Sequence, residues 1–353
     1  MRNRFGTGSS WTLAVVILRT LGVATLSVGT LAFGCSSPQP GGDGGSAGRR
    51  FLSIGTAPPG GAFFVVGGAL GEVLDEYQAA SGWEVNAEAT KGSQENIRRL
   101  DAGELDLALS NSAITYFAVR GTEGWEKAYP MRSVMTLASN IALFITASSS
   151  GIREIGDLRG KRVVIGPAGA GFEFFVRPLL NAHGLSFEDF TVLYNTQMGS
   201  VDMLADGSAA AVFIGGAVPT ASITQAATSQ DIFFVPFSAE AQESLVREFL
   251  FFRPATIPAG TYRGQDQDFD GLDVGSMHLI TSAAVDEELV YQVTRTIYEN
   301  RERVIEKHAA GRSINPDNVV RDTGTPFHPG AIRYYQEIGI WPEESVESGE
   351  SGS

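Results

Sequence analysis

Short apolar runs, glycine-rich loops and helical periodicity follow one another in the stretch from Phe51 to Leu74. An apolar strand ends at Ile54, a Gly/Pro-rich loop runs from Gly55 to Gly61, and apolar residues at helical spacing come next. A strand that passes through a glycine loop into a helix presents free backbone N–H groups and the positive end of the helix dipole. The pattern predicts a carboxylate or phosphate site, although many such turns carry glycines and bind nothing.

The same pattern returns from Lys161 to Leu180, and the elements after each copy also match. Each copy continues with a strand, a short turn, a helix and a closing strand, which are Trp83–Thr90, Lys91–Ser93, Glu95–Gly103 and Leu105–Ser112 in the first, and Thr191–Thr196, Gln197–Ser200, Val201–Gly207 and Ala209–Gly216 in the second. The landmark glycines pair as Gly55 with Gly166, Gly92 with Gly199, and Gly103 with Gly207. We therefore interpret the chain as an internal repeat.

Each copy predicts three parallel strands with helices packed on them, because crossover connections are right-handed. Ligands of such sheets sit outside the carboxyl ends of the strands. Two facing copies would place both glycine loops around one cleft, so the sequence predicts an α/β fold with two lobes.

Candidate ligand-binding residues come from the two glycine loops and from the strand ends. Backbone N–H donors, polar side chains after apolar strands and phenyl rings at a helix start make up the set. Ser93 has a second interpretation as a helix cap, and Glu173 as an acid that suits the helix dipole. The predicted ligand-binding residues are Thr56, Gly60, Gly61, Phe63, Phe64, Ser93, Ser110, Asn111, Ser112, Ala168, Gly169, Ala170, Gly171, Phe172, Glu173, Gly215, Gly216 and Pro219.

The two lobes are expected to exchange the chain twice, as a hinged, closing receptor requires. The first crossing is expected at the end of the β-rich stretch Met131–Ser150, and the return at Pro254–Tyr262. We therefore assign residues 51–146 and 256–342 to lobe 1 and residues 147–255 to lobe 2. An amphipathic helix is expected over Glu287–His308, and a terminal helix over Phe327–Ile340.

The first 34 residues predict a targeting segment, with Arg2 and Arg4 before an apolar run from Leu21 to Phe33. The run ends in LAFGC, which looks like the lipobox of bacterial lipoproteins, with Cys35 as the acylated residue. Ala32 departs from that pattern, and an uncleaved membrane anchor is the alternative. Residues 35–50 predict a flexible tether, and residues 343–353 a disordered acidic tail.

Composition narrows the functional classes. The net charge of −14 and the lack of a basic cluster argue against a nucleic-acid partner. A single cysteine excludes an intrachain disulfide, and four scattered histidines lack metal-ligand spacing. The predicted loops offer no nucleophile–base pair. We expect no metal, no cofactor and no catalytic residue.

Several motifs together resemble those of the TAXI receptors, the extracytoplasmic solute-binding proteins of one branch of TRAP transporters. The resemblance runs from about Phe51 to Ile340. Its motifs are Ile54–Gly61, Gly92–Leu109, Ala118–Gly121, Asp157–Gly171, Gly215–Ile223, Ile257–Tyr262 and Phe327–Ile340.

The resemblance implies a type II periplasmic-binding-protein fold with a hinged cleft between the lobes. It also implies capture of a small carboxylate or amino acid, glutamate-like or 2-oxoglutarate-like, and delivery to a TRAP-type permease driven by an ion gradient. A lipid anchor would hold such a receptor at the membrane, outside the cytoplasm.

Two departures from the family pattern bear on the ligand. Phe63 and Phe64 stand where the family usually has tyrosines, and Gly169–Phe172 (GAGF) stands where it has a hydroxyl-bearing GSGT-like run. Fewer hydroxyls and more phenyl rings predict a ligand less polar than glutamate, since a polar group is recognised by a partner that satisfies it.

Two other functional classes remain open at this point. A ligand-sensing lipoprotein that docks to a signalling protein would capture its ligand in the same way. An enzyme on the same scaffold is a weaker alternative, because folds host many functions but this one would need an acid–base constellation in the cleft.

Overall fold

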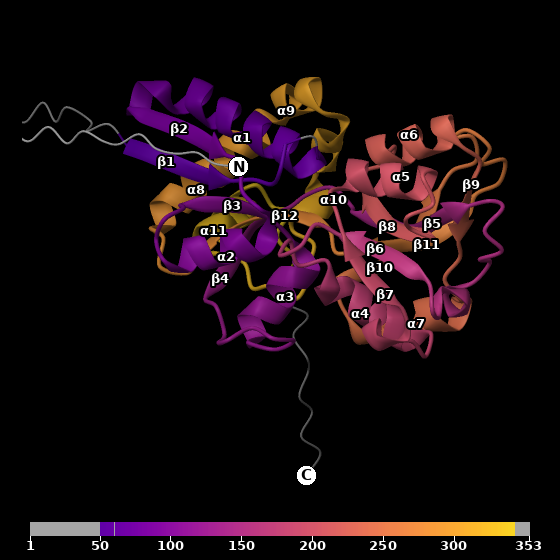
Figure 1. Ribbon diagram of the computed structural model, residues 1–353. Helices are drawn as coiled ribbons and strands as arrows, with labels where there is room; N and C mark the ends of the chain where they lie inside the picture. The colour runs from indigo at the N-terminus through magenta and orange to yellow at the C-terminus, as the bar shows by residue number, and fades with distance from the viewer. Residues whose placement is uncertain (1–49, 60, 343–353) are drawn as a thin grey trace, which may run out of the picture. The chain divides into compact units, whose positions relative to one another are not determined.

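The structure is a computed structural model and describes residues 50–59 and 61–342 (Figure 1). The predicted targeting segment, Cys35, most of the tether, Gly60 and the acidic tail lie outside the described residues. Among the residues described, no helix has both the length and the hydropathy needed to cross a membrane.

A five-stranded sheet forms the first lobe, in the order β2-β1-β3-β12-β4. Its strands are β1 (Arg50–Gly55), β2 (Trp83–Glu88), β3 (Leu107–Asn111), β4 (Met131–Thr136) and β12 (Met277–Ser282). A seven-stranded sheet forms the second lobe, in the order β10-β11-β5-β8-β6-β7, with β9 paired to β5. Its strands are β5 (Ile141–Ala147), β6 (Arg162–Gly166), β7 (Thr191–Tyr194), β8 (Ala211–Gly216), β9 (Ile232–Val235), β10 (Phe252–Ile257) and β11 (Phe269–Val274).

The predicted repeat is present in the topology of both sheets. In lobe 1, β1 pairs in parallel with β2 and with β3. In lobe 2, β6 pairs in parallel with β7 and with β8. Each set of three parallel strands is extended by an antiparallel strand that directly follows a crossing between the lobes. This strand is β12, beside β3, in lobe 1 and β5, beside β8, in lobe 2. Two lobes of this design, each completed by a strand that comes after a crossing, make the two-lobed periplasmic-binding-protein fold that was predicted.

The positions of the crossings differ from those predicted. Residues 137–140 connect β4 to β5, and residues 275–276 connect β11 to β12. Because β5, β10 and β11 belong to the second sheet, residues 141–146 and 256–274 lie in lobe 2 and not in lobe 1. Apolar strands look alike in sequence, and only the long-range pairing of β5 with β8, β9 and β11 shows which sheet it joins.

Eleven α-helices among the described residues cover the sheets. Lobe 1 carries α1 (Ala62–Gln78), α2 (Ser93–Asp101), α3 (Ser112–Arg120), α8 (Glu287–Glu299), α9 (Arg301–Lys307), α10 (Pro316–Val319) and α11 (Pro329–Glu337). Lobe 2 carries α4 (Glu173–Ala182), α5 (Gln197–Ala205), α6 (Ala221–Ser229) and α7 (Ala239–Glu248), with α5 and α6 on one face of its sheet and α4 and α7 on the other (Figure 1). Short 3-10 helices lie at Ala79–Ser81, Ile155–Leu158, Phe187–Asp189 and Ala309–Ser313.

Helix α1 shows how the sequence directs this packing. Val66, Leu70, Val73 and Leu74 recur at helical spacing and are all buried. The amphipathic stretch after Asp286 behaves similarly, but it divides into α8 and α9 at Asn300, where one long helix was predicted.

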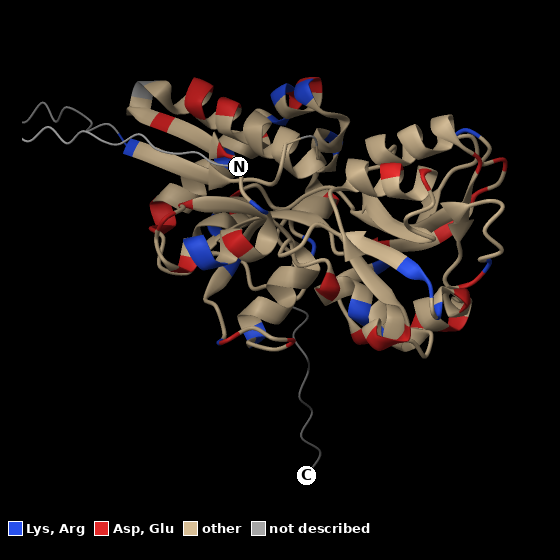
Figure 2. Ribbon diagram, viewed as in Figure 1, with Lys and Arg blue, Asp and Glu red and all other residues tan. Residues whose placement is uncertain are grey.

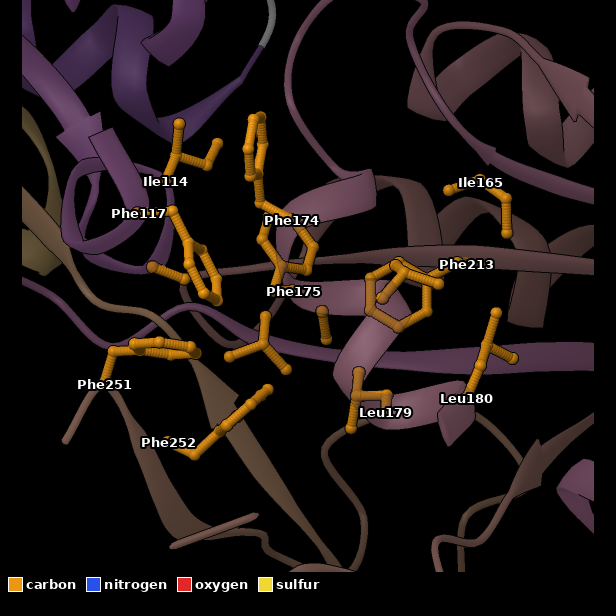
Figure 3. Packing of buried hydrophobic residues seen from close by; sticks show 14 of the residues in the cluster. Ile114, Phe117, Ile165, Phe174, Phe175, Leu179, Leu180, Phe213, Phe251 and Phe252 are labelled. Atoms are coloured by element: carbon orange, nitrogen blue, oxygen red, sulfur yellow. The ribbon is translucent and has the colours of Figure 1, made fainter. Parts of the chain in front are cut away.

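A cluster of buried aromatic residues joins the two lobes along one edge. Phe117 of α3 lies 6.1 Å from Phe174 of α4 and 5.6 Å from Phe251, measured between ring centroids. Trp125, which comes after α3, stacks on Phe174 at 5.5 Å. Figure 3 shows Phe117, Phe174 and Phe251 converging from three separate segments. The lobes therefore share one continuous apolar core at this edge.

Both crossings are held by a buried polar network. Asp273, at the end of β11, accepts a hydrogen bond from the backbone N–H of Asn140 at 3.1 Å and another from the hydroxyl of Ser276. The guanidinium of Arg321 lies 3.9 Å from the Asp273 carboxylate and donates to the Ser276 hydroxyl. Burial raises the pKa of Asp273, while the Arg321 charge opposes that shift. The Asp273 carboxylate thus ties residues 137–140 to residues 275–276 by hydrogen bonds, and Arg321 supplies its counter-charge.

Candidate functional site

The carboxyl ends of β1, β2 and β3 in lobe 1, and of β6, β7 and β8 in lobe 2, lead into the loops that were predicted to bind a ligand. Most of the ribbon where the lobes meet carries no charged residue, and Lys, Arg, Asp and Glu gather on the outer helices and loops (Figure 2). The contacts of each predicted residue show which side chains are available to a ligand.

Four of the six helices that begin at these strand ends share one feature. The N-cap residues Gly61, Gly92, Phe172 and Thr220 of α1, α2, α4 and α6 make no side-chain cap hydrogen bond. By contrast, α7, α8, α10 and α11, which begin elsewhere, are capped by the side chains Ser238, Asp286, Asn315 and His328. The other two helices at these strand ends, α3 after β3 and α5 after β7, are capped by the side chains of Asn111 and Thr196. Helix α9, which continues α8 directly, has no side-chain cap. Uncapped first turns leave N–H groups and a positive dipole end available to an anion.

In the first glycine loop, Thr56 is occupied within lobe 1. Its hydroxyl donates to the carbonyl of Glu88 at 2.7 Å, and its own carbonyl accepts from Thr90 and from Asn96. The structure therefore gives the Thr56 side chain a scaffolding role. Gly61 is exposed at the start of α1.

The two phenylalanines of this loop differ in their surroundings. Phe63 packs against the lobe 1 core. Phe64 is half-buried and belongs to no apolar cluster of the described residues, so it is the better candidate for contact with a ligand.

The polar residues after β3 form an internal network. The Ser93 hydroxyl accepts from the N–H of Asn111 at 2.9 Å, and the Ser110 hydroxyl lies 2.7 Å from that of Thr115. The Asn111 side chain caps α3 through Ala113 and donates to the carbonyl of Gly275. These bonds fix the carboxyl end of β3. The hydroxyl of Ser112 differs, because it is buried without a hydrogen-bond partner among the described residues.

The second glycine loop packs directly on lobe 1. Ala168 and Gly169 are exposed, whereas Ala170 and Gly171 are buried. A Cβ at Gly171 would lie 2.8 Å from Ile114, at a φ of +93° that side chains rarely adopt, so glycine is required for this approach.

Phe172 was predicted to line the cleft, and its ring points elsewhere. A Cβ at Gly166 would lie 2.5 Å from this ring, and the ring packs 5.1 Å from that of Phe175. Phe172 therefore contributes to the lobe 2 core, and Phe64 alone remains as the added phenyl ring near the cleft.

The glycines at the end of β8 have a structural cause. A Cβ at Gly215 would lie 2.3 Å from the Cβ of Ala142 on β5, so the sheet itself requires glycine there, where a ligand had been expected to explain it. Gly216 is buried and Pro219 is exposed. The N–H of Thr220 donates to the hydroxyl of Tyr262 at 2.8 Å, which anchors the loop after β8.

A cavity of about 200 Å³ opens where the two lobes meet beside α4. Two predicted residues, Gly169 and Glu173, line it. It is also lined by Gln94, Glu123, Gly124, Phe174 and Arg177, which were not predicted from the sequence. Arg177 lies one helical turn after Glu173, so the helical spacing in the sequence already places the two side chains on the same face of α4.

The charges of this cavity come from both lobes. Nε of Arg177 lies 3.5 Å from Oε2 of Glu123, and the two side chains are 50% and 44% exposed. An ion pair this exposed contributes less than about 1 kcal/mol, so it can break when the lobes move. The pKa of Tyr194 is raised by burial and by the carboxylate of Glu173, which places that charge close to the tyrosine hydroxyl.

Gln197 is a further residue that the sequence patterns did not single out. Its amide donates to the carbonyl of Gly215 at 2.8 Å and accepts from Ser222 at 2.9 Å. It thereby joins the start of α5 to the end of β8, as Ser93 joins the start of α2 to the end of β3. Among the residues that the structure describes, no group of His, Cys, Asp and Glu side chains is arranged to hold a metal ion.

These two sheets, with their paired loops at the carboxyl edges, define a two-lobed binding-protein fold. The chain belongs to the NMT1-like family, whose model matches residues 54–339.

Solved structures with a similar fold include the periplasmic aliphatic sulphonate binding protein SsuA from Escherichia coli (14% identity, 83% of this chain and 79% of that chain, TM-score 0.43). Another is the alkanesulfonate-binding protein SsuA from Xanthomonas axonopodis pv. citri bound to MOPS (15% identity, 82% of this chain and 90% of that chain, TM-score 0.47). A third is the amino acid ABC transporter substrate-binding protein AbpA from Streptococcus pneumoniae bound to L-arginine (13% identity, 75% of this chain and 95% of that chain, TM-score 0.44).

Proposed function

We propose that this protein is an extracytoplasmic solute receptor that captures a small carboxylate or amino acid and delivers it to a membrane permease. The observation that carries the proposal is the set of helix N-termini without side-chain caps at Gly61, Gly92, Phe172 and Thr220. They lie at the carboxyl edges of two facing parallel units, where unpaired N–H groups and dipole ends suit an anionic group.

Membership of the NMT1-like family is consistent with this role. The resemblance to TAXI receptors supports the finer assignment, in which the permease is of the TRAP type and is driven by an ion gradient. The same resemblance, with Cys35 at the end of the predicted signal run, supports a lipid anchor on the outer side of the membrane.

The ligand is proposed to be glutamate-like or 2-oxoacid-like and less polar than glutamate. Phe64 supports this, because a half-buried phenyl ring at the start of α1 offers apolar contact and no hydrogen bond. The glycine and alanine of the second loop offer backbone N–H groups alone, which bind a carboxylate but do not recognise further hydroxyls.

An enzyme on this scaffold is disfavoured by the state of His278, which lies on β12 close to the carboxyl end of β3. His278 is fully buried, and burial and the Arg321 charge lower its pKa to about 3. Its Nε2 lies 2.8 Å from the hydroxyl of Thr115. A ring held inside the lobe in this way is not placed to act on a ligand. A lipoprotein that senses a ligand and docks to a signalling protein stays the second candidate, since it would use the same cleft.

The test is a thermal-melt screen of the full chain in detergent against dicarboxylates, 2-oxoacids, amino acids and small branched or aromatic carboxylates. A ligand at 100 times its Kd adds about 2.7 kcal/mol to stability and raises Tm visibly. Gly61→Trp places a bulky side chain at an open position before α1, and we expect it to abolish the shift.

Gly68→Trp is the matched control, because Gly68 is also open but lies within the same helix and away from its start. A ligand shift that survives Gly61→Trp, or a screen in which no carboxylate raises Tm, would contradict the proposed function.

A further inference from the structure

The cavity beside α4 is built by both lobes. Gln94, Glu123 and Gly124 come from lobe 1, and Gly169, Glu173, Phe174 and Arg177 from lobe 2. A group held there touches both lobes at once, so its binding favours the closed arrangement. The volume of about 200 Å³ suits part or all of a small metabolite.

The charges in this cavity do not balance. Arg177 is engaged by Glu123 at 3.5 Å, and its guanidinium also lies 5.0 Å from the ring centroid of Phe187. Glu173 forms no ion pair with any residue that the structure describes. The first turn of α4 stabilises the Glu173 carboxylate through the helix dipole, and this side chain is half-buried. The Tyr194 hydroxyl lies beside this carboxylate but carries no charge, so one negative charge in the cavity remains without a counter-ion among the described residues.

The backbone at Glu123 is held in an unusual conformation. Its φ of +56° makes it the one non-glycine residue of the described chain in the left-handed region, and Gly124 comes next at +90°. A non-glycine residue held at positive φ costs about 1–3 kcal/mol and persists where the surrounding structure requires it. Here this conformation accompanies the contact between Glu123 and Arg177 of the other lobe.

We propose that this cavity accepts the ammonium group of a zwitterionic ligand, with Glu173 as the counter-ion and the Glu123–Arg177 pair closing the cavity between the lobes. The proposal rests on the proposed function and deepens it, because it selects amino acids over 2-oxoacids and dicarboxylates. The carboxylate of the same ligand would face the uncapped start of α2, where Gly92 lies against Ala170.

Matched pairs of ligands test the proposal, because each pair differs only by an ammonium group in place of an oxo group. Suitable pairs are L-glutamate with 2-oxoglutarate, L-leucine with 4-methyl-2-oxopentanoate, and L-phenylalanine with phenylpyruvate. We expect an amino member to raise the Tm of the full chain and to bind by calorimetry, and its oxo partner to bind at least about tenfold more weakly.

Glu173→Gln keeps the size of the side chain and removes its charge. It should weaken binding of the amino member by about 10- to 100-fold, since hydrogen bonds to charged groups are the strong ones, and should leave the oxo member unchanged. Glu240→Gln is the matched control, because Glu240 is an exposed acid in the first turn of α7 in the same lobe. The control should bind both members as the wild type does.

Each outcome is decisive. If Glu173→Gln binds the amino member as tightly as the wild type, or if the oxo member is preferred, the ammonium site is overturned while the receptor function stands. If no member of any pair binds but another carboxylate of the screen raises Tm, the ammonium site is overturned and the receptor function stands. If no carboxylate of the screen binds the wild-type protein, the receptor function fails and this proposal fails with it. The Tm of the ligand-free variant shows whether a loss of binding reflects a loss of folding.

Discussion

The two copies of the repeat reach the same topology with different chemistry at their ligand edges. In lobe 1, the buried amide of Asn96 donates to the carbonyls of Thr56 and Leu109, both at 2.8 Å, and so joins the ends of β1 and β3. In lobe 2, the hydroxyl of Ser200 bonds only within its own helix, to Thr196. Buried hydrogen bonds fix the edge of lobe 1, whereas in lobe 2 the hydrogen bonds of Gln197 are joined by glycine and aromatic packing, with Gly166 under Phe172.

This contrast shows that the two copies of the repeat share their backbone topology but not the side-chain contacts that stabilise it. Close packing of buried polar groups depends on most of them being hydrogen-bonded, and close packing against a glycine depends on the absence of a Cβ. The two lobes should therefore respond differently to pH and to matched substitutions.

Acid should destabilise the protein mainly through groups in lobe 1. The pKa of His278 on β12 is lowered to about 3, and burial also lowers the pKa of His328 at the start of α11. Below pH 6.5 these histidines bind more protons in the unfolded state than in the folded state. Their contribution to folding stability is therefore complete above that pH and is lost progressively as the pH falls toward 3. His278 alone accounts for at most about 1.4 kcal/mol for each pH unit in that window.

Urea unfolding of the full chain between pH 7 and pH 4 measures this slope. His278→Gln, which keeps a hydrogen-bonding group near Thr115, should flatten it. An unchanged slope would show that the acid sensitivity arises elsewhere.

The largest single-site difference is expected at Asn96 and Ser200. Asn96→Ala removes the amide donor from two buried carbonyls, of which that of Thr56 keeps its bond from Thr90, and leaves a void in the core. It should lower the free energy of unfolding by about 3 kcal/mol. Ser200→Ala should cost about 1 kcal/mol, because the carbonyl of Thr196 still accepts from the Ser200 N–H. If urea unfolding shows that both variants lose the same free energy of unfolding, the proposed difference between the edges of the two lobes is contradicted.

A smaller difference is expected at the matched glycines. Gly166→Ala places a Cβ 2.5 Å from the Phe172 ring at a φ of +137°, and should cost about 2–3 kcal/mol. Gly55→Ala meets the buried side chains of Leu105 at 2.5 Å and Asn96 at 2.7 Å, but at a φ that alanine adopts without strain, and should cost about 1–2 kcal/mol. The Tm values of the two variants measure this difference. A lower Tm for Gly55→Ala than for Gly166→Ala would contradict the prediction.

The order and type of the repeat elements could be predicted from the sequence, because apolar runs and glycine loops are local signals. Two landmark pairs are equivalent in the structure: Gly55 and Gly166 end strands, and Gly103 and Gly207 come after helices at φ of +71° and +75°. The middle pair is not equivalent. Gly92 precedes α2, whereas Gly199 lies inside α5, because Thr196 caps that helix and starts it earlier.

The candidate site was predictable in outline and not in its side chains. Helix starts and strand ends mark the edge, but hydrogen bonds such as those of Thr56 and Asn111 depend on residues far along the chain. The orientation of Phe172 depends on its contact with Gly166, and the pairing of Glu123 with Arg177 joins two lobes. Such contacts arise only after the sheets are placed, so local patterns do not show them.

The aromatic edge between the lobes also governs how the molecule comes apart. Phe117, Trp125 and Phe174 are each less than 8% exposed, and they cover one another across the lobe boundary. Melting either sheet alone would leave the rings of the other in water, which disfavours a half-unfolded state. The two lobes therefore constitute one cooperative unit of stability, although the chain that connects them passes through only two short crossings.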